Sequence, residues 1–524
     1  MAQRLRTFFS DYRLPLISGM LIGTSYIPFP PWAALFGFVP LWIFLIEQKS
    51  PKKAFIGGWI TSFLLTLIGF YWVAYVSREH GNIPWAVAFL VMLFFCLTAT
   101  YYIPVCSWIW VKWIQPRCPA PGWKWVMLAT LFAAGEKLYL TLFPWNFGYT
   151  WAWVQLPIAQ TAEWWGIDGL STITIFFSAA FGWCWQHRKT NKPLAKKVLW
   201  GSLAMFLGLN LMGEAIRPDI SKADKHLNVL LIQGNVGNLQ KEQAQRGYGF
   251  RTEIVQKYMQ LTKKALVEHA GKPIDFIVWP ETATPLRLSQ HYQSRPNQRR
   301  LLNFVKSMKQ NLVTGAYHEN PETGGVSNSL FVIDKLGRTQ KPYQKTHLLA
   351  FGEYFPIISQ FPELEDKLGL GSFERGKGPI SMPVGGVKIG PQICYESLFP
   401  LFSRGLTEAG SDVFVNLTND SWFGPFSEPF QNMIMTLARS IEFRRPTLRA
   451  TNTGFTTAMD AAGNIYERSQ WFTEQAMYIQ LPLLPREGKT FFHIFPFLSE
   501  VALGLLLVLF IFRIRKYPGN TNEV

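Results

Sequence analysis

Long apolar runs alternate with short polar segments over the first 217 residues, and the pattern then changes. Seven runs there suit the hydrocarbon core of a membrane, which takes about 20 residues to cross. They lie at 14–29, 32–47, 55–76, 85–111, 125–142, 160–186 and 198–214. An eighth run lies at 494–512. The pattern predicts seven transmembrane helices in 1–217, a polar domain at 218–490, and an eighth helix with a short tail in 491–524.

Within the polar domain the pattern consists of short β-rich runs separated by helix-like stretches. The predicted strands are 227–232, 274–279, 312–317, 328–334, 387–393, 411–417, 455–460 and 476–480. The predicted helices lie near 250–270, 297–310, 396–409 and 429–443. Near-continuous apolar strands such as 276–278 indicate sheets that another layer covers. We therefore expect a layered α/β domain with a core of its own.

Composition and charge support this division and predict an orientation. The apolar parts hold 18 of the 21 tryptophans and 20 Lys/Arg against 9 acids, while 218–490 holds 31 Lys/Arg against 25 acids. The net charge of +17 is thus spread over both parts, so no basic domain suited to nucleic acid stands out. With a cytoplasmic N-terminus, 17 of the 20 basic residues of the apolar parts fall in cytoplasmic segments. Seven crossings then place the polar domain on the outer side of the membrane, with both termini in the cytoplasm.

One cysteine, Cys394, lies in the polar domain, while the other four lie in the apolar part. A lone thiol in an oxidising compartment is either buried and inert or a reactive nucleophile. Cys394 ends a predicted strand and is followed by Tyr395, Glu396 and a helix-like run. A strand-to-helix turn exposes a nucleophile near a helix N-terminus, which favours the thiolate. Such a nucleophile also needs a base and a charge-stabilising group.

Two charged residues near other strand ends meet these needs. Glu281 closes a Trp-Pro-Glu motif, and Lys345 precedes a Phe-Gly-Glu-Tyr-Phe-Pro motif that contains Glu353. A carboxylate within reach of a thiol serves as general base, and a compact cation stabilises an oxyanion together with the backbone N–H after Cys394. Taken singly, a loop glutamate is usually solvated and a lysine is usually a surface charge.

Together, Glu281, Lys345 and Cys394, in this order and with these neighbours, resemble the nitrilase superfamily. The resemblance extends through the Asn-Leu-Thr-Asn-Asp-Ser-Trp-Phe-Gly segment at 416–424 and on to Gly454. With the apolar helices and a Phe-Pro-Trp motif in the membrane half, the whole chain resembles the apolipoprotein N-acyltransferase family. One departure is Asn432, where relatives often carry a histidine.

The resemblance implies a nitrilase-like αββα sandwich on a base of eight transmembrane helices. It places the protein in the bacterial inner (plasma) membrane, with the catalytic domain facing the periplasm. It implies ping-pong transfer of an acyl chain from a phospholipid, typically the sn-1 chain of phosphatidylethanolamine, through a thioester on Cys394. The acceptor is the α-amino group of the N-terminal diacylglyceryl-cysteine of an apolipoprotein.

By the same resemblance Glu281 is the general base, Lys345 stabilises the oxyanion, and Glu353 orients Lys345. Tyr395 and Glu396 are expected to shape the acyl pocket or its hydrogen bonds, with a structural role as the alternative. A lipid substrate also predicts exposed apolar loops, and Trp422 belongs to one of them. These loops are 355–372, with Phe355, Ile357, Ile358, Phe361 and Leu364, and 422–430, with Trp422, Phe423, Phe426 and Phe430.

Other readings of the same residues stay open. A membrane-tethered nitrilase-fold amidase acting on a small amide would use the same three residues with water as acceptor. A transporter or receptor with a ligand-binding outer domain would not need all three. No His/Cys/Asp cluster has metal-ligand spacing and no glycine-rich phosphate loop is evident, so we expect no metal and no nucleotide cofactor. In the membrane half, Glu136 and Lys137 suggest either an interfacial anchor or a role in lipid access.

Overall fold

The computed structural model describes residues 2–81, 83–118, 121–141, 143–237, 250–289, 295–350, 352–356, 358–361, 363, 371–485 and 488–516. Its contacts divide the chain into two compact units. We call Met1–Arg217 with Thr490–Val524 the helical unit, and Pro218–Lys489 the sandwich unit.

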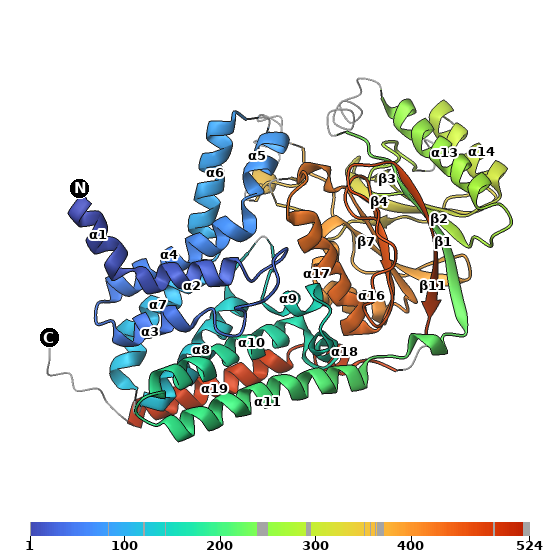
Figure 1. Cartoon of the computed structure of the whole chain (residues 1–524). Coiled ribbons are helices and arrows are strands. Elements are labelled where there is room, and N and C mark those ends of the chain that lie inside the picture. Colours follow the sequence, from blue (N-terminus) through green and yellow to red (C-terminus); the bar gives the residue numbers. More distant parts are fainter. Residues whose placement is uncertain are drawn as a thin grey trace. The chain divides into compact units, whose positions relative to one another are not determined.

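The helical unit is built from helices of very different lengths (Figure 1). They are α1 (Ala2–Asp11), α2 (Arg13–Gly23), α3 (Val39–Glu47), α4 (Pro51–Phe70), α5 (Val73–Gly81), α6 (Trp85–Thr98), α7 (Tyr102–Ile109), α8 (Pro121–Leu138), α9 (Gly148–Trp153), α10 (Ala162–His187), α11 (Lys192–Ile216), α18 (Phe491–Ile494) and α19 (Leu498–Lys516). Two of the long helices start alike: Ser50 and Asn191 each cap a backbone N–H, and proline follows in the first turn.

Among the described residues, four helical stretches are long and apolar enough to cross a membrane. They are Pro51–Phe70, Trp85–Arg117, Pro157–His187 and Lys192–Lys222. The first two predicted crossings give only the 11-residue α2 and the 9-residue α3. The chain between them forms turns and contains three prolines, which interrupt helical hydrogen bonding. The protein therefore has several membrane-length apolar helices, and the total of eight crossings stays a prediction.

The sandwich unit contains two sheets, one of six strands and one of five. The order in the first is β11 (Gln475–Leu483), β1 (Lys225–Gln233), β2 (Phe276–Val278), β3 (Leu312–Glu319), β4 (Val326–Ile333) and β5 (Tyr343–Gln344). The order in the second is β10 (Thr457–Met459), β9 (Thr447–Thr451), β8 (Val413–Thr418), β7 (Val387–Ile393) and β6 (Met382–Val384). Each of the eight predicted strands overlaps one of these. The prediction missed β5 and β6, which are only two and three residues long, and the polar β9.

A pair of helices covers each sheet. Helices α13 (Arg251–Glu268) and α14 (Pro296–Met308) pack on the six-stranded sheet through a buried apolar cluster (Figure 1). Helices α16 (Pro400–Glu408) and α17 (Glu428–Phe443) contact the five-stranded sheet, and the two sheets contact each other through β4 and β7. The unit is therefore an α/β sandwich of helix, sheet, sheet and helix layers.

Strand direction brings the candidate site residues together. Strands β1, β2 and β3 run parallel, as do β7, β8 and β9. Parallel strands present their carboxyl ends at one edge, where ligands bind in such sheets. Glu281 follows β2 and Cys394 follows β7, so each candidate lies at the carboxyl edge of its own sheet.

Candidate active site

A lysine held between two carboxylates forms the centre of the site. Nζ of Lys345 lies 2.8 Å from the carboxylate of Glu353 and 3.7 Å from Oε1 of Glu281. The Lys345 side chain is only 1% exposed, while that of Glu281 is 9% and that of Glu353 is 12% exposed. Withdrawing an ion from water costs several kcal/mol unless it is paired and hydrogen-bonded. The three groups therefore stabilise one another.

The pKa shifts assign different chemistry to the lysine and the thiol. Burial alone lowers the pKa of Lys345, but the carboxylates of Glu353 and Glu281 outweigh it and raise the pKa above its ordinary value. Burial raises the pKa of the Cys394 thiol, the charge of Glu281 raises it further, and Lys345 opposes both. Lys345 is thus a permanent cation, and the resting thiol is protonated and needs a base.

Asn328 on β4 holds the two carboxylates in place, a role that the sequence analysis did not predict. Its Nδ2 donates to Oε1 of Glu281 at 2.7 Å and to Oε1 of Glu353 at 3.2 Å. Its backbone carbonyl accepts from the N–H of Lys345 at 2.8 Å. A polar amide inside an otherwise buried strand is the signal that identifies it, because such a group must be hydrogen-bonded.

The loop that carries Glu281 lies directly against the neighbouring strand β3. A Cβ at Gly315 would lie 2.7 Å from the Cα of Glu281 and 2.6 Å from the N of Thr282. These distances are too short for any side chain, so only glycine allows the two backbones to approach. Gly315 thereby allows the loop that carries Glu281 to pack closely against β3.

Cys394 has a constrained backbone immediately after β7. Its φ is +55°, a left-handed conformation that costs free energy for a residue with a Cβ. Cys394 opens a short 3₁₀ turn, Cys394–Leu398, and the α-helix α16 begins only at Pro400. The predicted helix over 396–409, with its N-terminus at the thiol, is therefore wrong at its start. Proline favours the first position of a helix, which explains why α16 begins there.

Glu396 ties the cysteine segment to the lysine segment. Its Oε2 accepts from the N–H of Ile393 at 2.8 Å. Its Oε1 accepts from the hydroxyl of Tyr343 and the N–H of Thr346, both at 2.7 Å, and from the N–H of His347 at 3.0 Å. Burial raises the pKa of Glu396 to about 7, against the lowering effect of Lys345 and these hydrogen bonds. The geometry gives Glu396 a positioning role.

Tyr395, the other neighbour of the thiol, has both a polar and an apolar contact. Its hydroxyl donates to the carbonyl of Leu348 at 2.9 Å. Its ring packs edge-on against Phe399 at 5.1 Å, and Nζ of Lys345 lies 6.0 Å from the ring centroid. Tyr395 therefore braces the lysine segment from the cysteine side.

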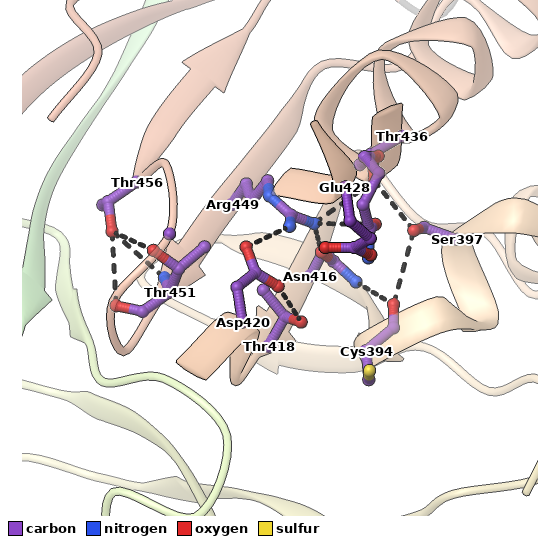
Figure 2. A network of polar contacts seen from close by, with 12 residues as sticks. Cys394, Ser397, Asn416, Thr418, Asp420, Glu428, Thr436, Arg449, Thr451 and Thr456 are labelled. Atoms are coloured by element: carbon purple, nitrogen blue, oxygen red, sulfur yellow. Dashed lines mark hydrogen bonds and ion pairs between the residues drawn. The ribbon is translucent and has the colours of Figure 1, made fainter. Parts of the chain in front are cut away.

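A buried network supports Cys394 from behind (Figure 2). Nδ2 of Asn416 donates to the carbonyl of Cys394 at 2.9 Å, and Oδ1 of Asn416 accepts from Arg449 at 2.6 Å. Arg449 is fully buried and pairs with Asp420 at 2.9 Å. Figure 2 shows the Cys394 carbonyl pointing into this network and the sulfur pointing away from it. The network fixes the strained backbone while leaving the thiol available.

Glu428 and Asn432 of α17 complete the network. Asn432 donates to Oε1 of Glu428 at 3.2 Å, and its own Oδ1 accepts from Arg449 at 3.3 Å. Burial and the nearby charge of Asp420 raise the pKa of Glu428 well above its ordinary value. Arg449 and Asp420 form the ion pair of this network. Asn432, where relatives often carry a histidine, thus links Glu428 of the same helix to Arg449 of β9.

Comparison with known proteins identifies the family of the chain. The carbon-nitrogen hydrolase model matches residues 239–484, and the model of the apolipoprotein N-acyltransferase N-terminal domain matches residues 18–180. The apolipoprotein N-acyltransferase of Bdellovibrio bacteriovorus is 40% identical over 495 residues, which cover 92% of this chain and 90% of that protein. The chain belongs to the apolipoprotein N-acyltransferase family.

A second relative agrees with this membership. The apolipoprotein N-acyltransferase of Geobacter metallireducens is 30% identical over 494 residues, covering 92% of this chain and 91% of its own. Among solved structures, a nitrilase-superfamily amidase of Nesterenkonia covers 51% of this chain, with 16% identity and a TM-score of 0.37.

The apolar loops predicted for an apolipoprotein N-acyltransferase are only partly present. In 355–372, Phe361 is 56% exposed, whereas Phe355 and Ile358 are half-buried and Ile357 and Leu364 lie outside the described residues. The prediction of an exposed loop at 422–430 is wrong. Of its aromatic residues, Phe423 is buried and Trp422, Phe426 and Phe430 are half-buried. Phe430 packs on Phe455 at 4.6 Å and on Trp471 at 5.4 Å.

Two further predictions concern Trp422 and metal binding. Trp422 is half-buried at the end of the 3₁₀ turn Asp420–Trp422 that follows β8. It follows Asp420, the partner of Arg449, by two positions in the sequence and does not lie on an exposed apolar loop. In the part of the chain that the structure describes, no group of three or more His, Cys, Asp or Glu side chains is placed to hold a metal ion.

Proposed function

We propose that the chain transfers an acyl chain from a phospholipid, typically the sn-1 chain of phosphatidylethanolamine, to an apolipoprotein. In the first step Glu281 takes the proton of the Cys394 thiol while the sulfur attacks the ester carbonyl. Lys345 and the backbone N–H of Tyr395 stabilise the oxyanion that forms. The C–O bond then breaks, the lysophospholipid oxygen takes the proton from Glu281, and the acyl group stays on Cys394 as a thioester.

In the second step the α-amine of the N-terminal diacylglyceryl-cysteine attacks the thioester in its neutral form. Glu281 accepts a proton from the attacking nitrogen, and the same cation stabilises the new oxyanion. The C–S bond breaks, the departing sulfur recovers the proton from Glu281, and the amide product leaves. One base and one cation therefore serve both half-reactions, which explains why Glu281 is held within 3.7 Å of Lys345.

The surrounding residues act on these three groups rather than on the substrate. Glu353 and Asn328 orient Lys345 and Glu281 through the hydrogen bonds described above. Glu396 fixes the distance between the lysine and cysteine segments, and Tyr395 braces them. Trp422 is the exception, since we propose that it contacts the substrate.

For the membrane part we propose eight crossings and a periplasmic catalytic domain. The domains are 1–217 with seven helices, 218–490 as catalytic domain, and 491–524 with the eighth helix and a cytoplasmic tail. The distribution of Lys and Arg and the apolar helices support this arrangement. A membrane base suits the reaction, because extracting an acyl chain into water costs about 0.8 kcal/mol per CH₂. The partners are the phospholipid donor, the diacylglyceryl apolipoprotein acceptor and the bilayer, with no cofactor.

The observation that carries this proposal is the buried Lys345, held between two carboxylates and electrostatically coupled to Cys394. Intact-protein mass spectrometry of the full-length chain with phosphatidylethanolamine tests it, with Cys394→Ala as the control. We expect an acyl-sized adduct on the wild-type protein alone, which a diacylglyceryl-cysteine peptide then removes as its N-acyl product.

The same experiment separates the alternatives. A folded wild-type protein that forms no adduct with phospholipid, but hydrolyses a small amide through Cys394, would establish the amidase instead. A thiol that is inert to both substrates and to an alkylating reagent would leave the outer domain as a ligand-binding module.

A further inference from the structure

The helical unit contains a buried carboxylate that no step above uses. Glu136, on α8, is 9% exposed. Its Oε2 accepts from the hydroxyl of Ser171 on α10 at 2.6 Å, while its Oε1 has no hydrogen-bond partner among the described residues. An ionisable group among membrane helices is costly to bury and usually marks a functional site.

Two phenols share the surroundings of this carboxylate. Tyr26 precedes α3 in the chain and Tyr102 begins α7, and they are only 2% and 3% exposed. Neither hydroxyl has a hydrogen-bond partner in the part of the chain that the structure describes. Both residues interact electrostatically with Glu136. Three oxygens from three separate segments are therefore buried together and left unsatisfied, although buried polar groups are almost always paired.

Other aromatic rings pack against Tyr26 and Tyr102. The ring of Tyr26 lies edge-on to Trp145 at 5.2 Å, and the ring of Tyr102 lies 4.9 Å from Tyr139. Rings of this kind attract a cation to their faces. The cluster therefore combines acceptor oxygens with an aromatic wall.

The charged side chains nearest to the cluster have partners of their own. Nζ of Lys137 points to α19, where it binds Glu500 at 2.8 Å and Ser499 at 3.0 Å. Asp168 accepts a hydrogen bond from the amide of Asn146. A single carboxylate with two phenols offers too few strong ligands for a metal ion, but it suits an ammonium, whose N–H groups bind the oxygens while its charge faces the rings.

We propose that Glu136, Tyr26 and Tyr102 form a subsite for a primary ammonium group carried by a lipid substrate. This inference rests on the proposed function, because two of its lipids carry that group: the ethanolamine headgroup of the donor and the α-amine of the acceptor cysteine. The shared chemistry is the ammonium, and the two half-reactions distinguish its source.

The decisive variant is Glu136→Gln, since glutamine keeps the size of the side chain and still accepts from Ser171 but removes the charge. Mass spectrometry would follow thioester formation from phosphatidylethanolamine and from phosphatidylglycerol, which has no ammonium, and separately the discharge onto a diacylglyceryl-cysteine peptide. Glu214→Gln, an exposed glutamate of the same unit, is the matched control.

For a donor subsite, Glu136→Gln slows thioester formation from phosphatidylethanolamine roughly tenfold or more and leaves that from phosphatidylglycerol unchanged. For an acceptor subsite, the same loss is confined to discharge. Wild-type rates in all three reactions would overturn the proposal, and so would equal losses in all three, which indicate a structural carboxyl group. If Glu136→Gln does not fold, Tyr102→Phe removes one acceptor oxygen and is expected to give a smaller loss with the same selectivity.

Binding without turnover keeps this test independent of the proposed reaction. In the Cys394→Ala protein, calorimetry would compare dihexanoyl phosphatidylethanolamine with dihexanoyl phosphatidylglycerol, and the lipopeptide with its N-acetylated form. Adding Glu136→Gln should weaken only one ammonium-bearing ligand, roughly tenfold or more. Such selectivity in a protein that forms no thioester would retain the subsite while refuting the acyl transfer; unselective binding would refute the subsite.

Discussion

Lys345 of the sandwich unit and Glu136 of the helical unit are both buried, but they differ in their partners. In the sandwich unit, buried ions meet partners supplied by the chain itself: Lys345 meets Glu353 and Glu281, and Arg449 meets Asp420. In the helical unit, the buried Glu136 keeps an oxygen without a hydrogen-bond partner among the described residues. Internal pairing fixes atoms for chemistry, whereas an acceptor left open suits a group that arrives from outside. The comparison thus separates the proposed reaction centre, which is preorganised, from the proposed recognition site.

Preorganisation in the sandwich unit extends to the backbone. Cys394 holds a left-handed φ, and three neighbours constrain it: Asn416 binds its carbonyl, Ser397 approaches the same oxygen at 3.4 Å, and Glu396 binds the preceding N–H of Ile393. A strained residue persists only where its surroundings determine its conformation. The buried charges of this unit therefore serve geometry as well as electrostatics.

Removing the central cation should have the largest effect. Lys345→Met leaves Glu281 and Glu353 buried together without a counter-charge and removes the oxyanion partner. We expect the rate of thioester formation to fall by about 10³-fold, and the free energy of unfolding to fall by about 3–5 kcal/mol. Mass spectrometry of the adduct and calorimetry measure the two effects.

The exposed Lys341→Met is the matched control and should change neither quantity. Because folding and chemistry fall together in Lys345→Met, the rate is compared only at a temperature where the variant is folded. Thioester formation at the wild-type rate in the folded variant would show that the reaction does not need Lys345. The buried ions of the sandwich unit would then not be the reaction centre.

Breaking the network behind the nucleophile should have the next largest effect. Asn416→Leu removes the hydrogen bond to the Cys394 carbonyl and the shortest of the hydrogen bonds that Nη1 of Arg449 donates. We expect about 1–3 kcal/mol of destabilisation and a loss of roughly tenfold in the maximal rate of thioester formation. The Michaelis constant for phospholipid should stay the same, because no group that contacts substrate is changed.

Thr407→Val, on α16, removes only a hydroxyl bonded within its own helix and serves as the control. A change in the Michaelis constant with an unchanged maximal rate would place Asn416 in substrate binding. That result would contradict the positioning role of the network.

Much of the sandwich unit is predictable from sequence because each of its longer strands has a recognisable apolar pattern within its own few residues. Runs such as Phe276–Val278 are apolar on both faces and end at motifs with recognisable chemistry, so Glu281 and Cys394 are found from the sequence. Asn328 and Arg449 were not assigned roles, because a polar residue within a strand reveals its partner only after distant segments are brought together. The start of α16 was also misplaced, since a 3₁₀ turn and a helix share the same short-range pattern.

The helical unit is less predictable in detail. Hydropathy identifies α4 and α10, but it does not distinguish a full crossing from the short α2 and α3, which are joined by proline-rich turns. The orphaned oxygens of Tyr26 and Tyr102 cannot be anticipated at all, because aromatic residues are common throughout apolar helices. Sequence marked Glu136 as unusual but gave no partner for it.

Glu396 should make the stability of the protein depend on pH. Its pKa of about 7 in the folded protein lies above the ordinary value of 4.5. Between these values the folded state binds more protons than the unfolded state, so stability falls as pH rises from 4.5 to 7 and is constant above that. The loss is on the order of 3 kcal/mol.

Glu396→Gln cannot titrate, so the stability difference between wild type and variant should shrink over that pH range. Calorimetry at several pH values measures it, with the exposed Glu408→Gln as control. A constant difference would mean that Glu396 is ionised throughout, with its four hydrogen bonds outweighing the effect of burial.

The smallest effect should come from Tyr395→Phe. The substitution removes one hydrogen bond, from the hydroxyl to the carbonyl of Leu348, and keeps the ring contacts with Phe399 and Lys345. We expect a loss of about 1 kcal/mol in stability and almost no change in the rate of thioester formation. Burial raises the pKa of Tyr395 to about 12, so its hydroxyl is a poor proton donor. A large loss of rate in the folded Tyr395→Phe protein would instead make that hydroxyl part of the proton transfer, and the reaction centre would then extend beyond the buried ions.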